Sequence, residues 1–242
     1  MASVLEIKNF SKSYQKSVKA VDGLSLTVSA GEIYGFIGHN GAGKTTTIRA
    51  VAGVLDFEEG EIYVSGRSVR DDPVGAKSAV AYIPDNPDIY EFVTGIQYLN
   101  FLGDMYGVPK AEREESIKKR ADIFDLTGAL GDLVGSYSHG MKQKLALIGG
   151  FLHKPLLMVL DEPFVGLDPQ ASFDMKNMMR ELCDAGGAIF FSTHVLEVAE
   201  KICDRIAIIK NGRLAASGAT DEVLESGISL EELFMEVAKR DA

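Results

Sequence analysis

One nine-residue stretch constrains the fold of this chain more than any other. It reads Gly38-His39-Asn40-Gly41-Ala42-Gly43-Lys44-Thr45-Thr46 and fits the phosphate-binding pattern G-x-x-x-x-G-K-[ST] at every required position. The apolar run 33–37 before it predicts a strand, and residues 46–52 after it predict a helix. Glycines let backbone N–H groups curl around an anion, toward which the helix points its positive end. The stretch therefore predicts a nucleoside triphosphate site, because a chance glycine-rich turn would not have both flanks.

Two residue types in this loop have a defined chemical use. Lys44 brings a mobile cation to the β- and γ-phosphates, and the Thr45 hydroxyl is a ligand for magnesium. All nine residues from Gly38 to Thr46 are accordingly predicted to contact the nucleotide.

A pair of carboxylates follows a later apolar run, residues 156–160, which ends in Asp161-Glu162-Pro163. By itself this pattern is as typical of a strand that ends in a solvated acidic turn. Beside a phosphate loop it predicts the second half of a nucleotide site. Asp161 would hold magnesium through a water or the Thr45 hydroxyl, and Glu162 would polarise the attacking water.

The composition is that of a globular protein, with 242 residues, 46% of them hydrophobic and 25% charged. This length suits one large α/β domain or two small ones. The net charge of −10 disfavours general nucleic-acid binding, since phosphate backbones select basic surfaces, but it leaves room for a local basic groove. Cys183 and Cys203 fall in stretches predicted to be helical and are expected to be small buried side chains in a reducing cytosol.

Neither a signal peptide nor a membrane-spanning helix is expected. Residues 1–6 lack a basic segment followed by an apolar core, and no window of about eighteen residues is continuously apolar. Any membrane-spanning segment that this protein works with is therefore expected on another chain.

Hydrophobic periodicity predicts two kinds of short strand. Residues 5–10, 24–28 and 61–64 alternate polar and apolar side chains, which is typical of antiparallel strands with one solvated face. Continuous apolar runs instead predict a parallel sheet that is covered on both sides. These runs occupy residues 156–160, 188–191 and 206–209, and Asn211-Gly212 after the last one is a hairpin signal.

Helical periodicity fills the region between the two kinds of strand and the end of the chain. Three helices are expected between residues 86 and 145: one capped by Thr94 that runs to Met105, one over 110–124, and one capped by Ser138. Two short helices are expected after Gly218, the second opened by the capping box Ser229-Leu230-Glu231-Glu232.

Four further segments occur in the chain besides the phosphate loop and the acidic pair. They are Tyr14, Ser136-Tyr137-Ser138-His139-Gly140-Met141-Lys142-Gln143, Phe164-Val165-Gly166-Leu167-Asp168, and His194 after Phe190-Phe191-Ser192-Thr193. With them, nearly the whole chain resembles the nucleotide-binding domain of the ABC ATPase family. The resemblance implies an α/β fold: a P-loop NTPase core with a mostly parallel sheet, an antiparallel β subdomain and an inserted α-helical subdomain.

The resemblance also implies a role for each segment. Tyr14 would stack on adenine, Asp168 would belong to the D-loop, and His194 would hydrogen-bond the γ-phosphate and hold the attacking water in line. Ser138 and Gly140 open a predicted helix, where a hydroxyl, backbone N–H groups and the helix dipole attract an anion. In the family, that anion is the γ-phosphate of ATP bound to a second protomer.

Simpler interpretations stay open for two of these segments. Ser138 is also what an ordinary capped helix needs, and His194 is also compatible with a hydrogen-bonded core histidine or with a metal pair formed with Glu197.

Two positions depart from the family's pattern. His139 stands where a glycine is usual and would crowd or hydrogen-bond the partner's nucleotide. Asp85, which ends Tyr82-Ile83-Pro84-Asp85, stands where glutamine is usual. Its carboxylate can still bind magnesium or its waters, so Asp85 is kept as a predicted active-site residue although it adds negative charge near a polyphosphate.

We therefore expect one ABC ATPase domain over residues 1–242, which hydrolyses ATP with Mg²⁺ and uses Glu162, His194 and Lys44 as catalytic residues. Two copies, or this chain and a relative, would sandwich two ATP molecules. The expected division is a core over 1–85 and 146–220, a helical insertion over 86–145 and a helical tail over 220–242.

The expected partner is a separate transmembrane permease, with this subunit bound peripherally on the cytoplasmic side of a bacterial cell membrane and with export favoured over import. Ile89, Tyr90 and Phe92 are predicted exposed anchors for the permease, unless they pack inward. The alternative function is a soluble ABC ATPase acting on DNA or ribosomes, but such relatives usually carry two cassettes or a long coiled coil. A P-loop kinase or GTPase leaves the segment Ser138–Gly140 without a use.

Overall fold

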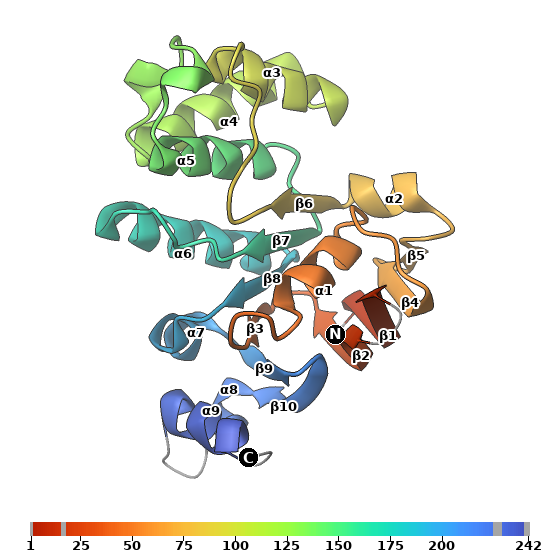
Figure 1. Cartoon of the computed structure of the whole chain (residues 1–242). Helices are drawn as coiled ribbons and strands as arrows, with labels where there is room; N and C mark the ends of the chain where they lie inside the picture. Colours follow the sequence, from red (N-terminus) through yellow and green to blue (C-terminus); the bar gives the residue numbers. More distant parts are fainter. Residues whose placement is uncertain (1, 16–17, 225–228, 240–242) are drawn as a thin grey trace.

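The computed structural model describes residues 2–15, 18–224 and 229–239 (Figure 1). Its strands form two sheets. One sheet has four strands in the order β2-β1-β4-β5, and the other has six in the order β10-β9-β3-β8-β7-β6. A group of helices lies at one end of the six-stranded sheet, beyond β6, and a short helical tail lies at the other, beyond β10 (Figure 1).

The four-stranded sheet is antiparallel, as the alternating segments predict. It contains β1 (Ser3–Gln15), β2 (Val18–Ser29), β4 (Glu59–Val64) and β5 (Arg67–Ser68). The expectation of short strands was wrong for β1 and β2, which have 13 and 12 residues. Asn9 has a left-handed φ of 49° where the β1–β2 register shifts, and this bulge interrupts the alternation within a longer strand.

The six-stranded sheet is parallel except for its last strand. Its members are β3 (Ile33–Ile37), β6 (Val80–Ile83), β7 (Leu157–Asp161), β8 (Ala188–Thr193), β9 (Arg205–Lys210) and the antiparallel β10 (Arg213–Ala219). The predicted hairpin is confirmed, because Asn211 and Gly212 both adopt positive φ, at 49° and 77°, between β9 and β10. Parallel pairing brings the carboxyl ends of β3, β6, β7 and β8 to one edge of the sheet.

Helices follow these strands and cover the sheet. They are α1 (Lys44–Val51), α2 (Pro73–Ser78), α6 (Pro169–Asp184) and α7 (Leu196–Ile202). Cys183 lies in α6 as predicted, whereas Cys203 lies just after α7 because that helix ends at Ile202. Both thiols are buried, and burial raises the pKa of each, that of Cys183 to about 12.

The three predicted helices of the insertion are present as α3 (Gly95–Met105), α4 (Lys110–Ile123) and α5 (His139–Gly150). Two 3₁₀ turns, Thr127–Ala129 and Val134–Ser136, connect α4 to α5. Thr94 and Ser138 cap α3 and α5 by accepting hydrogen bonds from the backbones of Gln97 and Met141.

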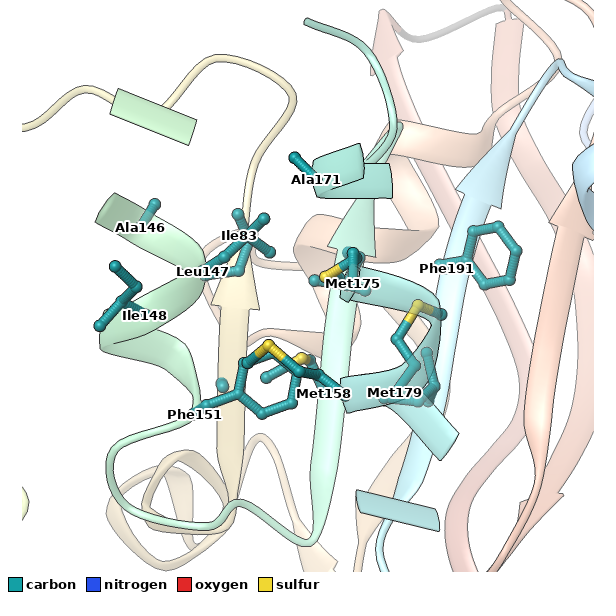
Figure 2. Close-up of a cluster of buried hydrophobic side chains, with 14 of the residues drawn as sticks. Ile83, Ala146, Leu147, Ile148, Phe151, Met158, Ala171, Met175, Met179 and Phe191 are labelled. Carbon is teal, nitrogen blue, oxygen red and sulfur yellow. The ribbon is translucent and has the colours of Figure 1, made fainter. Parts of the chain in front are cut away.

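The helix α5 continues past residue 145 and returns the chain to the sheet. Figure 2 shows Leu147 of α5, and Phe151 directly after it, beside Ile83 of β6 and Met158 of β7, with Met175 and Met179 of α6 on the other side. All these side chains belong to one buried cluster, so packing rather than a linker joins the insertion to the core.

The described part of the tail contains α8 (Thr220–Val223) and α9 (Leu230–Lys239), while residues 225–228 and 240–242 lie outside the described residues. The predicted capping box is confirmed, since the Ser229 N–H donates to Glu232 Oε2 at 2.8 Å and the Glu232 N–H donates to Ser229 Oγ at 3.2 Å. Leu230 and Val237 are buried in the main core, so α9 packs on the domain.

Candidate functional site

The loop between β3 and α1 requires glycine at two positions. A Cβ on Gly38 would stand 2.7 Å from the carbonyl oxygen of Ile209. Gly43 has φ 109°, and a Cβ there would stand 2.6 Å from the carbonyl oxygen of Ala20. The loop is therefore pressed against β9 and β2, and only glycine lets the backbone take this path.

The helix α1 begins at this loop with its N-terminus available to an anion. Its N-cap residue, Gly43, offers no side-chain hydrogen bond, and its first turn contains no acidic residue. The first N–H groups of a helix have no partner within the helix, so they can bind a phosphate here.

The Lys44 ammonium is held inside the loop. Only 7% of the residue is exposed, and its Nζ donates to the carbonyl oxygens of Gly38 at 2.7 Å and His39 at 3.4 Å. Thr45, the next residue of α1, is exposed, whereas the buried Thr46 lies 3.2 Å from the Tyr14 hydroxyl, Oγ1 to Oη. Tyr14 is thereby brought from β1 to the loop with its ring exposed.

The acidic pair at the end of β7, Asp161 in the strand and Glu162 after it, lies opposite this loop. Asp161 is buried and accepts a hydrogen bond from the Ser192 hydroxyl of β8. Glu162 has a left-handed φ of 48°, held by hydrogen bonds from its N–H to the Ser192 carbonyl and hydroxyl oxygens, each 3.2 Å away. A non-glycine residue in this conformation is strained, and such strain is concentrated at functional sites.

The Glu162 carboxylate lies between two cationic or protonatable groups. Its Oε1 is 2.9 Å from His194 Nδ1 and 3.7 Å from Lys44 Nζ, and its Oε2 accepts the His194 backbone N–H at 3.3 Å. The structure thus brings together the three predicted catalytic residues from three separate elements: α1, the turn after β7, and the end of β8.

A cavity of about 380 Å³ lies between the phosphate loop and the acidic pair. Its lining residues are Tyr14, Ala20, His39, Asn40, Gly41, Gly43, Lys44, Thr45, Thr46, Asp85, Asp161 and Glu162. Ala20 is the one lining residue absent from the sequence-based prediction. It reaches the site because β2 runs beside the loop, and no local sequence signal identifies it.

The residues present fit a magnesium ion together with a polyphosphate. The Thr45 hydroxyl and the carboxylates of Asp161 and Asp85 are hard oxygen donors in the lining of one cavity. In the described ranges, no three or more His, Cys, Asp or Glu side chains are grouped to hold a metal, which gives the proposed pair of His194 and Glu197 no further ligand. Magnesium suits such a site, because it commonly takes one or two carboxylates and completes its shell with phosphates and waters.

Ser138, Gly140 and Asp168 lie elsewhere, outside the lining of this cavity. Ser138 is exposed and accepts the Met141 N–H at 3.3 Å, and a Cβ on Gly140 would stand 2.7 Å from the Gly166 carbonyl oxygen. Asp168 caps α6 by accepting the Ala171 N–H at 2.8 Å and pairs with Lys144 at 2.8 Å.

These contacts join the two segments 138–140 and 164–168 in one surface. The Ala171 N–H, and then Lys144, hold the pKa of Asp168 below its usual value. The His139 ring lies against Gly166, where an added Cβ would stand 2.8 Å from its Cδ2 atom. This surface contributes no residue to the lining of the cavity.

The prediction of three exposed anchors at residues 89–92 was wrong for Ile89. That side chain is 5% exposed and packs with the helices of the insertion, whereas Tyr90 and Phe92 are 74% and 90% exposed. Alternation along this loop turns one side chain inward and leaves the other two on the surface.

Comparison with known proteins decides the family. The family model described as "ABC transporter" matches residues 21–165. The ABC-type transporter ATP-binding protein EcsA of Bacillus subtilis (strain 168) is 35% identical, over 99% of this chain and 98% of that protein. The chain belongs to the ABC transporter ATP-binding proteins.

Two further matches support the assignment of this ABC ATP-binding subunit to its family. The linearmycin resistance ATP-binding protein LnrL of Bacillus subtilis (strain 168) is 32% identical, over 91% of this chain and 70% of that protein. A solved structure described as an ATP-binding subunit of an ABC transporter superposes with a TM-score of 0.93 at 36% identity, over 98% of this chain and all of that one. The predicted α/β P-loop fold and its nucleotide-binding role are thus confirmed. Across the described ranges, no helix is both long and apolar enough to cross a membrane.

Proposed function

We propose that this ATP-binding subunit hydrolyses ATP in the cavity between β3 and β7, and that this reaction powers a membrane transporter. The observation that carries the proposal is the position of Glu162, whose carboxylate contacts His194 at 2.9 Å and faces Lys44 at 3.7 Å beside the phosphate loop. Binding alone would need the loop; it would not need a strained carboxylate next to it.

The loop residues Gly38–Thr46 bind the triphosphate through their backbone N–H groups and the N-terminus of α1. Lys44 already donates to two loop carbonyls, so its ammonium is placed to add phosphate oxygens to its partners. Tyr14, exposed at the mouth of the cavity, presents its ring to the adenine.

Glu162 is the proposed base. It polarises a water and accepts its proton as the water oxygen bonds to the γ-phosphorus, and the bond from that phosphorus to the ADP oxygen breaks, which releases ADP and phosphate. His194 is held against the Glu162 carboxylate, which lines the cavity, and would hydrogen-bond the γ-phosphate from there. Thr45, Asp161 and Asp85 would hold Mg²⁺, which neutralises phosphate charge when it is bound.

The active assembly is proposed to be a dimer, of two copies or of this chain and a relative. Ser138, Gly140 and Asp168 form an exposed polar surface that their own cavity does not use. A helix N-terminus with a serine at its cap is a ready anion site, so this surface would contact ATP held by the second subunit and close the dimer.

The proposed partner is a separate permease, with this subunit on the cytoplasmic side of a bacterial membrane. Tyr90 and Phe92 are exposed near the start of the proposed helical insertion (86–145), which interrupts the core (1–85 and 146–220), and would anchor the permease there. Export is favoured because the similar LnrL protein is described by resistance to a compound. Action on DNA or ribosomes is disfavoured by the net charge of −10 and by relatives described as transporter subunits.

The decisive experiment is Glu162→Gln, measured by phosphate release and by nucleotide titration. The amide keeps the size of the side chain and removes the base, so turnover should fall roughly 10²–10⁴-fold while ATP affinity is retained. Glu197→Gln, the same change on exposed α7, is the matched control and should leave turnover unchanged. Undiminished phosphate release by Glu162→Gln would remove Glu162 from the reaction.

A further inference from the structure

A second cavity lies between the helical insertion and the core, and it shares no lining residue with the nucleotide cavity. Its volume is about 300 Å³. It is bounded by the C-terminal half of α4, the end of α5 with the turn that follows, and the C-terminal half of α6. The lining residues are Lys119, Arg120, Ile123, Phe151, Lys154, Pro155, Leu156, Met178, Glu181, Leu182, Ala185 and Gly187.

The lining combines an apolar interior with a basic rim. Aliphatic, aromatic and thioether side chains make up its apolar part, including Ile123, Phe151 and Met178. Three of its four charged residues are basic, although the whole chain has 25 Lys and Arg against 35 Asp and Glu. This local reversal of charge indicates a ligand with an apolar body and an acidic group.

Two of the three cations already have a carboxylate partner. Lys119 lies 3.8 Å from Glu181, Nζ to Oε2, and Lys154 pairs with Glu112 across the gap between the α5–β7 turn and α4. Both pairs lie at the exposed rim, where ion pairs are weak and exchange readily.

Arg120 is different, since it has no carboxylate within ion-pair distance in the described part of the chain. Its guanidinium donates only to the Ser116 carbonyl and hydroxyl oxygens one turn earlier and lies over the Phe151 ring, 5.6 Å from the centroid. Its Nε is buried without a hydrogen-bond acceptor, and burial lowers the pKa of the side chain. Glu181 stabilises the Arg120 charge only from beyond ion-pair distance, so the half-buried guanidinium is incompletely compensated, and an anion in the cavity would supply a direct partner.

We propose that this cavity binds a small amphipathic carboxylate, with its acidic group at Arg120 and its alkyl chain against Ile123, Phe151, Met178 and Leu182. Such a ligand satisfies both halves of the lining at once: the apolar wall gains buried hydrocarbon, and the guanidinium gains a charge-assisted hydrogen bond. A neutral or cationic chain of equal length would satisfy only the apolar half.

The ligand would also connect two parts of the molecule. Arg120 and Ile123 belong to α4, whereas Met178 and Leu182 belong to α6, so a bound chain touches the insertion and the core together. Because it binds the folded chain at a site absent from the unfolded chain, it should raise the melting temperature once its concentration exceeds its dissociation constant.

The test is calorimetric titration of the full chain, without nucleotide, with decanoate, decanol and decylammonium. Decanoate should bind saturably at one site and more tightly than the other two compounds, and it should raise the melting temperature. Arg120→Gln should weaken decanoate binding about tenfold or more, the usual worth of one charge-assisted hydrogen bond. Lys118→Gln removes a neighbouring exposed charge on α4 outside the cavity and should leave the affinity unchanged.

A second variant keeps the test decisive if Arg120→Gln does not fold. Ala185→Trp adds bulk at an exposed lining position at the end of α6 and should abolish binding without touching the charges. The proposal is overturned if decanoate shows no saturable binding, if the three head groups bind equally, or if binding survives Ala185→Trp unchanged.

Discussion

Glu162 combines a strained backbone with a carboxylate that lies between His194 and Lys44. The left-handed φ of 48° turns its side chain from the end of β7 toward His194 and Lys44. The Ser192 backbone and hydroxyl hold this conformation, and the same hydroxyl donates to Asp161. One side chain on β8 thus orients both members of the acidic pair, which their sequence adjacency alone does not indicate.

Lys44→Ala should reduce nucleotide affinity about ten- to a hundredfold. The lost ammonium contributes charge-assisted contacts to phosphate, each worth about 1.5–3 kcal/mol. It also donates to the carbonyl oxygens of Gly38 and His39, so the loop loses an internal support. Titration with a fluorescent ATP analogue measures the effect. The control is Lys118→Ala, which changes an exposed residue of α4. Equal affinities of Lys44→Ala and the parent chain would contradict the assigned role.

His153 should make stability depend on pH. Its ring stacks on Tyr106 at 3.7 Å, its Nε2 lies 3.3 Å from the Val80 carbonyl oxygen, and its Nδ1 is buried without a partner. Burial lowers the pKa of His153 in the folded chain below the ordinary 6.5 that it keeps in the unfolded chain. In the pH window between the folded and the unfolded pKa, the unfolded chain therefore binds more protons than the folded chain. Stability therefore rises with pH across that window and is lost as pH falls through it.

His153→Phe keeps an aromatic ring on Tyr106 and removes the titrating group. Between about pH 7 and pH 5, the parent chain should lose more stability than this variant, because only the parent has an imidazole to protonate. Melting temperatures of both chains across this range provide the measurement. Parallel pH curves would show that His153 is not the titrating group.

The N-termini of the helices divide into two kinds. Gly43 leaves α1 without a side-chain cap, whereas Thr94, Ser138 and Asp168 each cap a helix with an oxygen. A capped helix satisfies its own first N–H groups; an uncapped one needs another partner. The helices α4 and α7 also lack a side-chain cap, but α1 is the uncapped helix whose first residues line the cavity beside Glu162.

Thr94→Ala should destabilise the chain by about 1 kcal/mol, within the usual range of about 0.5–2 kcal/mol for an N-cap. The variant loses the hydrogen bond from the Gln97 N–H, and the reciprocal bond from the Thr94 N–H to Gln97 Oε1 at 2.9 Å loses its companion. Urea unfolding measures the change. Thr94→Ser retains the capping oxygen and should recover most of the stability; a loss as large as that of alanine would show that the methyl group matters instead.

At the scale of the whole molecule, the separation of Ser138 from its own nucleotide cavity makes a prediction about assembly. Glu162→Gln should bind ATP without hydrolysing it and should therefore accumulate as a dimer, measured by analytical ultracentrifugation with Mg²⁺ and ATP. Adding Ser138→Phe should keep that protein monomeric, because the ring blocks the proposed contact with the second subunit.

Ser138→Ala in the same background is the matched control. Both substitutions remove the cap of α5, but only phenylalanine adds bulk, so the alanine variant should still form dimers. Dimers of equal stability in the phenylalanine variant would exclude Ser138 from the interface.

The main parts of the candidate site were predictable because each part is a contiguous segment of the chain. A phosphate loop uses neighbouring backbone groups, so Gly38–Thr46 carries its chemistry within nine residues. Strand type was predictable for the same reason, since burial on one or two faces produces either alternation or a continuous apolar run within a few residues. The Asn211-Gly212 turn and the Ser229 capping box are equally local and are both confirmed.

Tertiary structure decided whatever depends on distant neighbours. It buried Ile89 among the helices of the insertion, brought the Ala20 carbonyl against Gly43, and left the buried Nε of Arg120 without a hydrogen-bond acceptor. No local pattern encodes these outcomes, because burial and charge pairing are properties of surfaces that meet only after folding. The sequence by itself predicted a triphosphate site at Gly38–Thr46, and the folded chain placed His194 and Lys44 beside the Glu162 carboxylate.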